Sequence, residues 1–125
     1  MLRACRRVLR PDGWMAFHVI FVASGLSEED AARADAAGPP YVSAAGSYTE
    51  LLASAGFGEI DELDLTDQYR LTAAAWFRES ARAARQLEEI FGVEEFRQRQ
   101  QEREETLAAI EGGLLRRWLF AAQAT

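Results

Sequence analysis

Apolar and polar positions follow two different spacings along this chain, and the spacing separates predicted helices from predicted strands. Residues 2–9 place apolar side chains three or four positions apart with arginines between them, which predicts an amphipathic helix. The sequence Pro-Asp-Gly at residues 11–13 is typical of a turn, and proline disfavours helical backbone at the residue before it. The first helix therefore ends just before Pro11.

The most apolar stretch of the chain follows this turn. Residues 14–22 are almost continuously apolar and rich in aromatic and β-branched side chains. Such a run is typical of a strand covered on both faces, as in a parallel sheet. Periodicity alone leaves a buried helix open, but Gly13 before the run and Gly25 after it favour the strand.

The middle of the chain alternates between loop signals and short elements. Small residues, glycines and prolines fill residues 24–46, which we interpret as a long loop with a short helix at 28–36 capped by Ser27. Residues 47–50 form a capping-box pattern that begins another short helix, and Gly56 lies where a helix ends in the left-handed conformation. Residues 60–65 alternate leucines with acids and predict a strand with one drier face.

The second half of the chain is dominated by helical spacing. Thr66-Asp67 is a cap signal for a long helix that Gly92 interrupts, and a second helix rich in Glu, Gln and Arg ends at residues 112–113. We interpret residues 114–124 as a final strand. The apolar positions of the two helices are Phe77, Ala81, Ala84, Leu87, Phe91, Val93, Phe96, Leu107 and Ile110.

These elements suggest one partial domain over residues 1–125. Its core portion of strand, helix and strand covers residues 1–66, a helical section covers 67–113, and the final strand covers 114–125. An alternation of strands and helices around a nearly continuous apolar strand is typical of an α/β fold.

Composition narrows the classes of function. A chain of 125 residues with 49% hydrophobic and 27% charged residues is typical of a folded domain, and its formal charge of -6 gives no electrostatic case for a nucleic-acid partner. A single cysteine, Cys5, and a single histidine, His18, exclude an internal disulfide and a zinc cluster of nitrogen and sulfur ligands. No apolar run reaches the roughly 18 residues of a spanning helix. The basic start before residues 14–23 imitates a signal peptide, but His18 interrupts the run, so we expect a cytoplasmic protein without a membrane partner.

Two short segments resemble landmarks of the class I S-adenosylmethionine-dependent methyltransferases. Residues 7–15, Arg-Val-Leu-Arg-Pro-Asp-Gly-Trp-Met, are similar to the segment that leads into the family's fifth strand, although Asp12 stands where glycine is commoner. Residues 55–57, Ala-Gly-Phe, are similar to the end of the helix that follows. The resemblance implies the carboxyl-terminal half of a Rossmann-like doubly wound sheet. Residues 67–111 are then a helical insertion before a last strand that runs antiparallel between the other two.

The resemblance also implies a cofactor and partners. S-adenosylmethionine serves the complete family fold, but neither the family's Gly-rich loop nor its ribose-binding acid has a counterpart in these 125 residues. We therefore expect no appreciable cofactor binding and no activity from this chain alone. The expected partners are a small-molecule methyl acceptor and either a missing amino-terminal half or a second copy of the chain.

Candidate site residues follow from position in the family and from chemistry. Methyl transfer from a sulfonium requires an acceptor positioned in line with the methyl group, and in some cases a base. His18 is the candidate base, and a hydrogen-bonded structural histidine is the alternative. Loop anchoring or aromatic packing is the alternative for the substrate-binding candidates. These candidates are Phe21, Ser24, Tyr41, Tyr69 and Trp76.

Charged residues at 97–105 show no metal-binding pattern, and we interpret them as a solvated helix face with local ion pairs. Two functions remain open for the chain. It is either part of a methyltransferase domain or a non-catalytic interaction module derived from that fold. In the second case the helical section would pair with another helix or copy through Phe77, Leu87, Phe91, Phe96 and Leu107.

Overall fold

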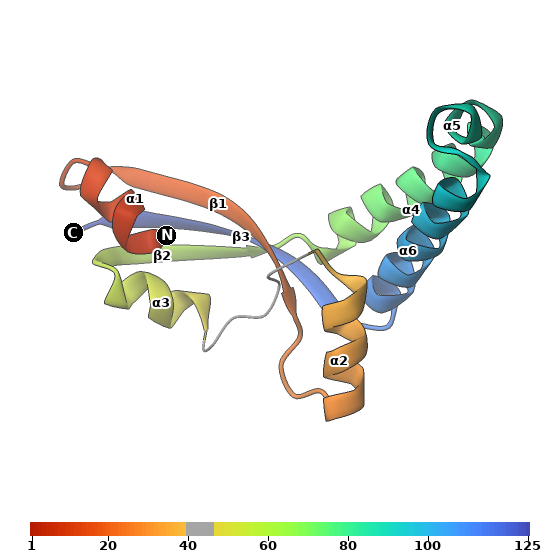
Figure 1. Cartoon of the computed structure of the whole chain (residues 1–125). Coiled ribbons are helices and arrows are strands. Elements are labelled where there is room, and N and C mark those ends of the chain that lie inside the picture. The colour runs from red at the N-terminus through yellow and green to blue at the C-terminus, as the bar shows by residue number, and fades with distance from the viewer. Residues whose placement is uncertain (40–46) are drawn as a thin grey trace.

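A computed structural model describes residues 1–39 and 47–125 of the chain. The three strands form one sheet. Figure 1 shows short helices beside one end of this sheet and the other helices at its opposite end. The elements are α1 (Leu2–Val8), β1 (Trp14–Val22), α2 (Glu28–Ala37), α3 (Tyr48–Ser54), β2 (Phe57–Asp64), α4 (Thr66–Arg82), α5 (Ala84–Phe91), α6 (Val93–Glu111) and β3 (Leu115–Ala124).

The last strand lies in the centre of the sheet. The strand order is β1-β3-β2, and β3 pairs antiparallel with both neighbours, with Phe17 opposite Phe120 and Leu63 opposite Leu119. This arrangement confirms the expected final strand running antiparallel between the other two. The sequence predicts that β1 belongs to a parallel sheet. β1 and β2 do run parallel, but they do not pair with each other, because β3 lies between them.

Local signals define several ends of helices as the sequence predicts. The Ser27 hydroxyl accepts a hydrogen bond from the Asp30 N–H at 3.1 Å at the start of α2, and the Ser47 hydroxyl accepts one from the Glu50 N–H at 3.2 Å at the start of α3. These bonds satisfy N–H groups that have no partner inside the first turn of a helix. Gly56 follows α3 with φ +95°, a conformation that costs glycine little.

The start of α4 differs from the prediction. Thr66 is the first helical residue, and Leu65 precedes it without a side-chain cap. The Asp64 carboxylate accepts the hydrogen bond from the Thr66 N–H at 2.9 Å, so the turn signal lies two residues before the predicted Thr-Asp pair. The long helix also divides at Ala83, whose ψ of 17° lies outside helical geometry, into α4 and α5.

The second strand is longer than predicted, and its side chains are more exposed to solvent. It begins at Phe57, three residues before the predicted start, and Phe57 is buried. The drier face predicted from its leucines is wrong at Leu63, whose side chain is 54% exposed. No described element covers that side chain.

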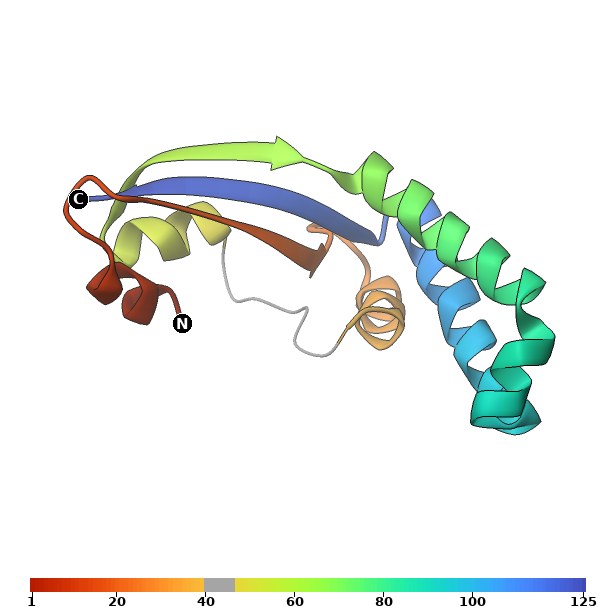
Figure 2. The same ribbon diagram turned by 90° about the horizontal axis from the view of Figure 1, so that it is seen from above.

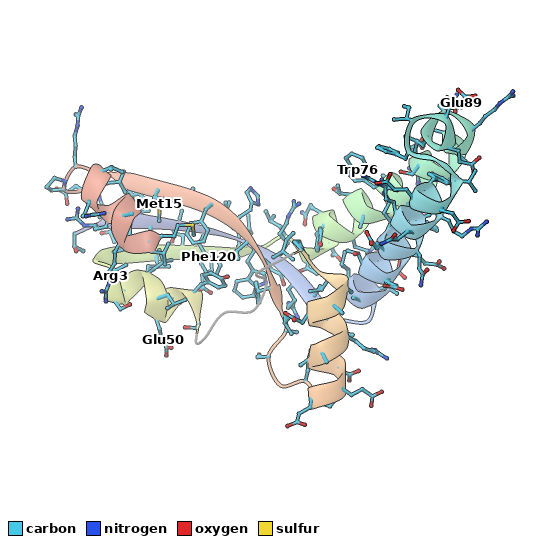
Figure 3. All side chains as sticks on the ribbon, in the orientation of Figure 1. Arg3, Met15, Glu50, Trp76, Glu89 and Phe120 are labelled. Carbon is cyan, nitrogen blue, oxygen red and sulfur yellow. The ribbon has the colours of Figure 1, made fainter. Side chains whose placement is uncertain are left out.

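One cluster of apolar side chains holds α1 and α3 against the sheet. Met15 and Phe120 belong to it, and both are labelled in Figure 3. The ring centroids of Phe17 and Phe120 lie 5.6 Å apart in a stacked arrangement, which joins β1 to β3. The buried members of this cluster are Leu52, Phe57, Phe120, Ala122 and Ala124.

A second apolar cluster lies at the opposite end of the sheet, where α2, α4 and α6 meet it. Ile20 and Val22 of β1 pack against this cluster, and Leu115 at the start of β3 is fully buried in it. Its buried members are Ala34, Tyr69, Ala109, Ile110, Leu114 and Leu115. The helical arm α4–α6 is thus attached through its end near the sheet and extends away from α1 and α3 in both views (Figures 1 and 2).

Other elements cover only part of β1. Trp14 is 49% exposed, and Ala16 and His18 on the same face are also exposed, while Ile20 and Val22 further along are half-buried. The prediction of a strand covered on both faces therefore holds only for its second half, because α2 and α6 reach only that part. Within the described ranges, no helix is both long and apolar enough to cross a membrane.

Candidate functional site

The carboxyl ends of β1 and β2 point toward the same end of the molecule. Val22 lies opposite Leu115, and Asp64 lies opposite Trp118, so both strands end near the start of β3. Open α/β sheets bind ligands outside the carboxyl ends of their parallel strands. Helices α2, α4 and α6 gather at this end (Figure 1).

A groove of about 600 Å³ opens between these three helices. Its walls are formed by the end of α2, by one face each of α4 and α6, and by a side chain of β3. This volume lies in the range of small-molecule sites, roughly 300 to 1,000 Å³. The polar and aromatic side chains on its walls include Tyr69, Thr72, Trp76, Arg99, Arg103, Thr106 and Arg117.

One wall of the groove is an aromatic and small-residue face of α4. Tyr69, Thr72, Ala73 and Trp76 are three or four positions apart, which places them on one side of a helix. Tyr69 is 9% exposed at the base of α4, whereas Trp76 is 64% exposed further along it (Figure 3). The face therefore runs from a buried phenol to an open indole.

The facing wall belongs to α6. The Arg99 guanidinium forms an ion pair with Glu95 at 3.0 Å and lies 4.1 Å from the centroid of the Phe91 ring. Arg103 donates to the side-chain oxygen of Gln100 at 2.9 Å. The Thr106 hydroxyl donates to the carbonyl of Ala37 and so ties α6 to the end of α2.

Arg117 of β3 lies at the base of the groove. Its backbone is held by two hydrogen bonds, one from its N–H to the Thr66 hydroxyl at 3.3 Å and one from the Leu65 N–H to its carbonyl at 2.8 Å. Its guanidinium carbon lies 5.5 Å from the centroid of the Tyr69 ring, within cation–π range. Its Nε is buried and has no hydrogen-bond partner in the described structure.

Neighbouring Arg116 points to the other face of the sheet. It forms an ion pair with Asp64 at 2.8 Å across the β2–β3 ladder. A hydrogen bond from the Thr66 side chain is the largest influence on the pKa of Asp64 and lowers it; partial burial opposes this, and the Thr66 N–H and Arg116 add to the lowering. Asp64 is therefore an ionised partner of Arg116 and does not line the groove.

The Tyr69 hydroxyl is held in its neutral form. Burial raises the pKa of this phenol, and the nearby Arg117 charge opposes the rise without cancelling it. At neutral pH the groove thus contains a neutral phenol next to a permanent positive charge.

Two of the predicted substrate-binding residues, Tyr69 and Trp76, line the same groove. Phe21 lies elsewhere, packed among aromatic rings with centroid distances of 6.0 Å to Tyr48 and 5.9 Å to Trp118. Ser24 is exposed in the turn after β1. Tyr41 lies outside the described residues.

His18 lies in the middle of β1, opposite Leu119. Its side chain is exposed, and the described part of the chain offers it no hydrogen bond, so the structural role considered for it finds no partner there. The register places Arg117 opposite Ile20, two positions further along the same sheet face. His18 does not line the groove.

Sequence reasoning missed the arginines of the groove. The interpretation of residues 97–105 as a solvated face holds for Arg97, which pairs with Glu94 at 3.3 Å, but Arg99 and Arg103 face the groove. A usable signal is their spacing of three to four residues with Thr106, which sets these side chains on one side of α6. Arg117 had no such signal, because its role depends on the pairing of β3. Among the described residues no cluster of histidine, cysteine and acidic side chains has the arrangement of a metal site.

Similarity to known proteins is found in structure and not in sequence. No protein-family model matches the sequence, and no curated protein matches it significantly. Among solved structures, phosphoethanolamine N-methyltransferase 2 of Haemonchus contortus, in complex with phosphomonomethylethanolamine and S-adenosylhomocysteine, aligns with a TM-score of 0.84 at 15% identity over 98% of this chain and 29% of its own. The cyclopropane synthase MmaA2 of Mycobacterium tuberculosis aligns over 98% of this chain and 48% of its own, with a TM-score of 0.77 at 15% identity. The mycolic acid cyclopropane synthase CmaA1 in its apo form aligns over 98% of this chain and 50% of its own, with a TM-score of 0.79 at 18% identity.

These likenesses concern the fold. The chain has the α/β fold of the carboxyl-terminal part of S-adenosylmethionine-dependent methyltransferases, as the two sequence landmarks predict. It spans at most half the length of the three structures named above.

Proposed function

We propose that this chain is the acceptor-side part of an S-adenosylmethionine-dependent methyltransferase whose amino-terminal half binds the cofactor. The observation that carries the proposal is the groove at the carboxyl end of the sheet, in a chain with a methyltransferase fold. The bound phosphomonomethylethanolamine of the Haemonchus contortus enzyme supports a small molecule as the acceptor.

The chain's own residues do not fit S-adenosylmethionine. Nucleotide-type cofactors are held by a Gly-rich loop between a strand and a helix. Among the described residues, the glycines with positive φ, Gly25, Gly56, Gly92 and Gly113, are separate turn residues at distant points of the chain. The cofactor site therefore belongs to the part of the fold that lies outside these 125 residues.

The work of this part is to bind and orient the acceptor. The Tyr69 and Trp76 rings offer an amphipathic wall, on which an acceptor packs its apolar part and to which it turns its polar end. Positioning of this kind accounts for much of the rate of a bimolecular transfer. Where the acceptor must lose a proton, His18 stays the proposed base. Because His18 does not line the groove, this role requires the acceptor to extend along the exposed face of β1 to reach the imidazole. A reducing cytoplasm is the proposed location, because Cys5 is the sole cysteine.

A binding measurement tests this division of labour. The 125-residue chain and a longer chain extended upstream in the same reading frame are titrated calorimetrically with S-adenosylmethionine and S-adenosylhomocysteine. We expect binding by the longer chain and none by the shorter. Saturable binding by the 125-residue chain would contradict the division, and absence of binding by both would remove the methyltransferase function.

A second candidate function rests on the helical arm. The side chains first expected to form its docking face are instead buried or half-buried in the chain itself. The large apolar side chains that the arm does expose are Leu71 at 59%, Trp76 at 64%, Ile90 at 71% and Val93 at 52%. An interaction module would use these side chains. Self-association of the chain that Ile90→Glu abolishes, together with no cofactor binding by the longer chain, would favour this function.

A further inference from the structure

Two of the three arginines that line the groove form no ion pair within the described part of the chain. The groove is lined by Arg99, Arg103 and Arg117. Arg99 pairs with Glu95 at 3.0 Å, whereas in the described part of the chain no carboxylate lies within ion-pair distance of Arg103 or Arg117. Two guanidinium groups are therefore available to a ligand.

Glu102 and Glu105 also line the groove and balance the formal charge of Arg103 and Arg117, but neither glutamate forms an ion pair with these arginines. The carboxylate of Glu102 accepts a hydrogen bond from Gln98 at 3.2 Å, and that of Glu105 accepts one from Gln101 at 3.0 Å. Both partners lie one turn earlier on α6, so these bonds run along the helix. The carboxylates do not close the groove by pairing with its arginines.

Arg117 also has an unmet hydrogen-bonding requirement. Its Nε–H is buried at the base of the groove without a partner among the described residues, and a buried donor left unpaired is costly. Its backbone N–H and carbonyl are both hydrogen-bonded, to Thr66 and Leu65 respectively. A planar guanidinium held in this way is suited to two parallel hydrogen bonds with a carboxylate or phosphate.

We propose that the groove binds the oxyanion of a small molecule, a carboxylate or a phosphate, through Arg117 and Arg103, with the Tyr69 and Trp76 rings against the remainder of the ligand. The aromatic face of α4 and the arginines of α6 and β3 line one groove of about 600 Å³, which a small ligand can fill. The identification of this ligand as the methyl acceptor rests on the proposed function. The prediction that the groove binds an anion is independent of that function.

Nuclear magnetic resonance of the ¹⁵N-labelled 125-residue chain tests the proposal without any cofactor. Inorganic phosphate and, separately, acetate replace chloride at constant ionic strength, and the Arg117 Nε–H and the Trp76 indole N–H are observed. We expect saturable shifts of both signals with at least one of the two anions. The anion that binds more tightly identifies the chemical class.

Three variants make the test specific. Arg103→Gln leaves α6 intact, since glutamine is a good helix former, and we expect it to weaken anion binding by about fivefold to tenfold. Arg117→Lys keeps the positive charge but loses the planar guanidinium that can donate two parallel hydrogen bonds, so we expect this variant to weaken anion binding as well. Arg97→Gln is the matched control, because Arg97 is 71% exposed, pairs with Glu94 and lies outside the groove.

Each outcome has a defined meaning. Shifts that grow linearly without saturation, or equal losses in Arg103→Gln and Arg97→Gln, would overturn the proposal, because binding would then follow net charge alone. Methyl transfer by the longer chain with no anion binding in the groove would overturn this inference and leave the proposed function. Saturable anion binding without methyl transfer would support the inference and count against that function.

Discussion

The Nε of Arg6 donates a hydrogen bond to the carbonyl oxygen of Gly56 at 3.1 Å, although fifty positions separate the two residues. The same guanidinium also donates to the carbonyls of Leu9 and Thr125. Gly56 in turn accepts a hydrogen bond from the Thr125 N–H at 3.1 Å. One side chain of α1 therefore joins the end of α3 to the end of β3.

This contact predicts the effect of Arg6→Ala on stability. Loss of charge-assisted, half-buried hydrogen bonds should lower the free energy of unfolding by about 1 to 2 kcal/mol. Urea denaturation measures the change. Arg7→Ala is the control on the same helix, because Arg7 is exposed and makes no hydrogen bond in the described structure, and it should change stability by less than about 0.5 kcal/mol. Equal effects of the two variants would show that Arg6 does not join these elements.

Asp64 predicts a loss of stability in acid. Its pKa is lowered in the folded chain, chiefly by the Thr66 side chain. Its contribution is therefore complete above the unfolded value of about 3.9 and is lost as the pH falls through the lower folded value. Thermal unfolding between pH 6 and the acid limit should show a smaller decline for Asp64→Asn than for the parent chain. Asp61→Asn, on the same strand, should leave the decline unchanged.

The contact between Tyr69 and Arg117 predicts a change in the alkaline range. Burial raises the pKa of Tyr69 and Arg117 partly offsets this rise, so Arg117→Met should raise that pKa further. Because the folded pKa lies above the unfolded value of about 10, the stabilisation is present below that value and lost as the pH rises through the folded pKa. Ultraviolet titration, with Tyr69→Phe to identify the signal, measures the shift. A fall in the Tyr69 pKa in Arg117→Met would contradict the contact.

The open side of β1 predicts self-association. One edge of β1 pairs with β3, its other edge pairs with no described strand, and Trp14, Ala16 and His18 are exposed on one face. Unpaired edges accept strands from other chains. Sedimentation should show association that increases with concentration and that Ala16→Lys reduces. Ala53→Lys, an equal change of charge at an exposed site of α3, should not reduce it, and a monomer at all concentrations would contradict the prediction.

Elements with strong local signals could be predicted from the sequence. The caps at Ser27 and Ser47 and the turn at Gly56 depend on hydrogen bonds or φ angles within a few residues, so the sequence predicts them well. The exposure of Leu63 depends on which elements cover β2. Alternation of apolar and polar residues does not show whether another element packs on the strand. The prediction of a buried face on β2 failed at Leu63 for this reason.

The residues of the candidate site also divide into those that the sequence could predict and those that it could not. Tyr69 and Trp76 became candidates because they open the long helix near the pocket that the family resemblance implies, and the structure places both in the lining of the groove. Arg117 was missed because its position depends on pairing with β1, almost a hundred residues earlier in the chain, where Ile20 lies opposite it. The distinction between Arg116, paired with Asp64, and Arg117, in the groove, arises only once β3 has two faces.

The central position of β3 has a consequence for how the chain is made. β1 and β2 emerge from the ribosome before β3, yet they make no ladder with each other, and the strand that joins them is synthesised after the whole helical arm. Closing these distant pairs requires the whole chain and is intrinsically slow. Until then the apolar side of β1 is without its partner Phe120. We therefore expect an interrupted or truncated translation product that lacks β3 to be a target of chaperones and proteases.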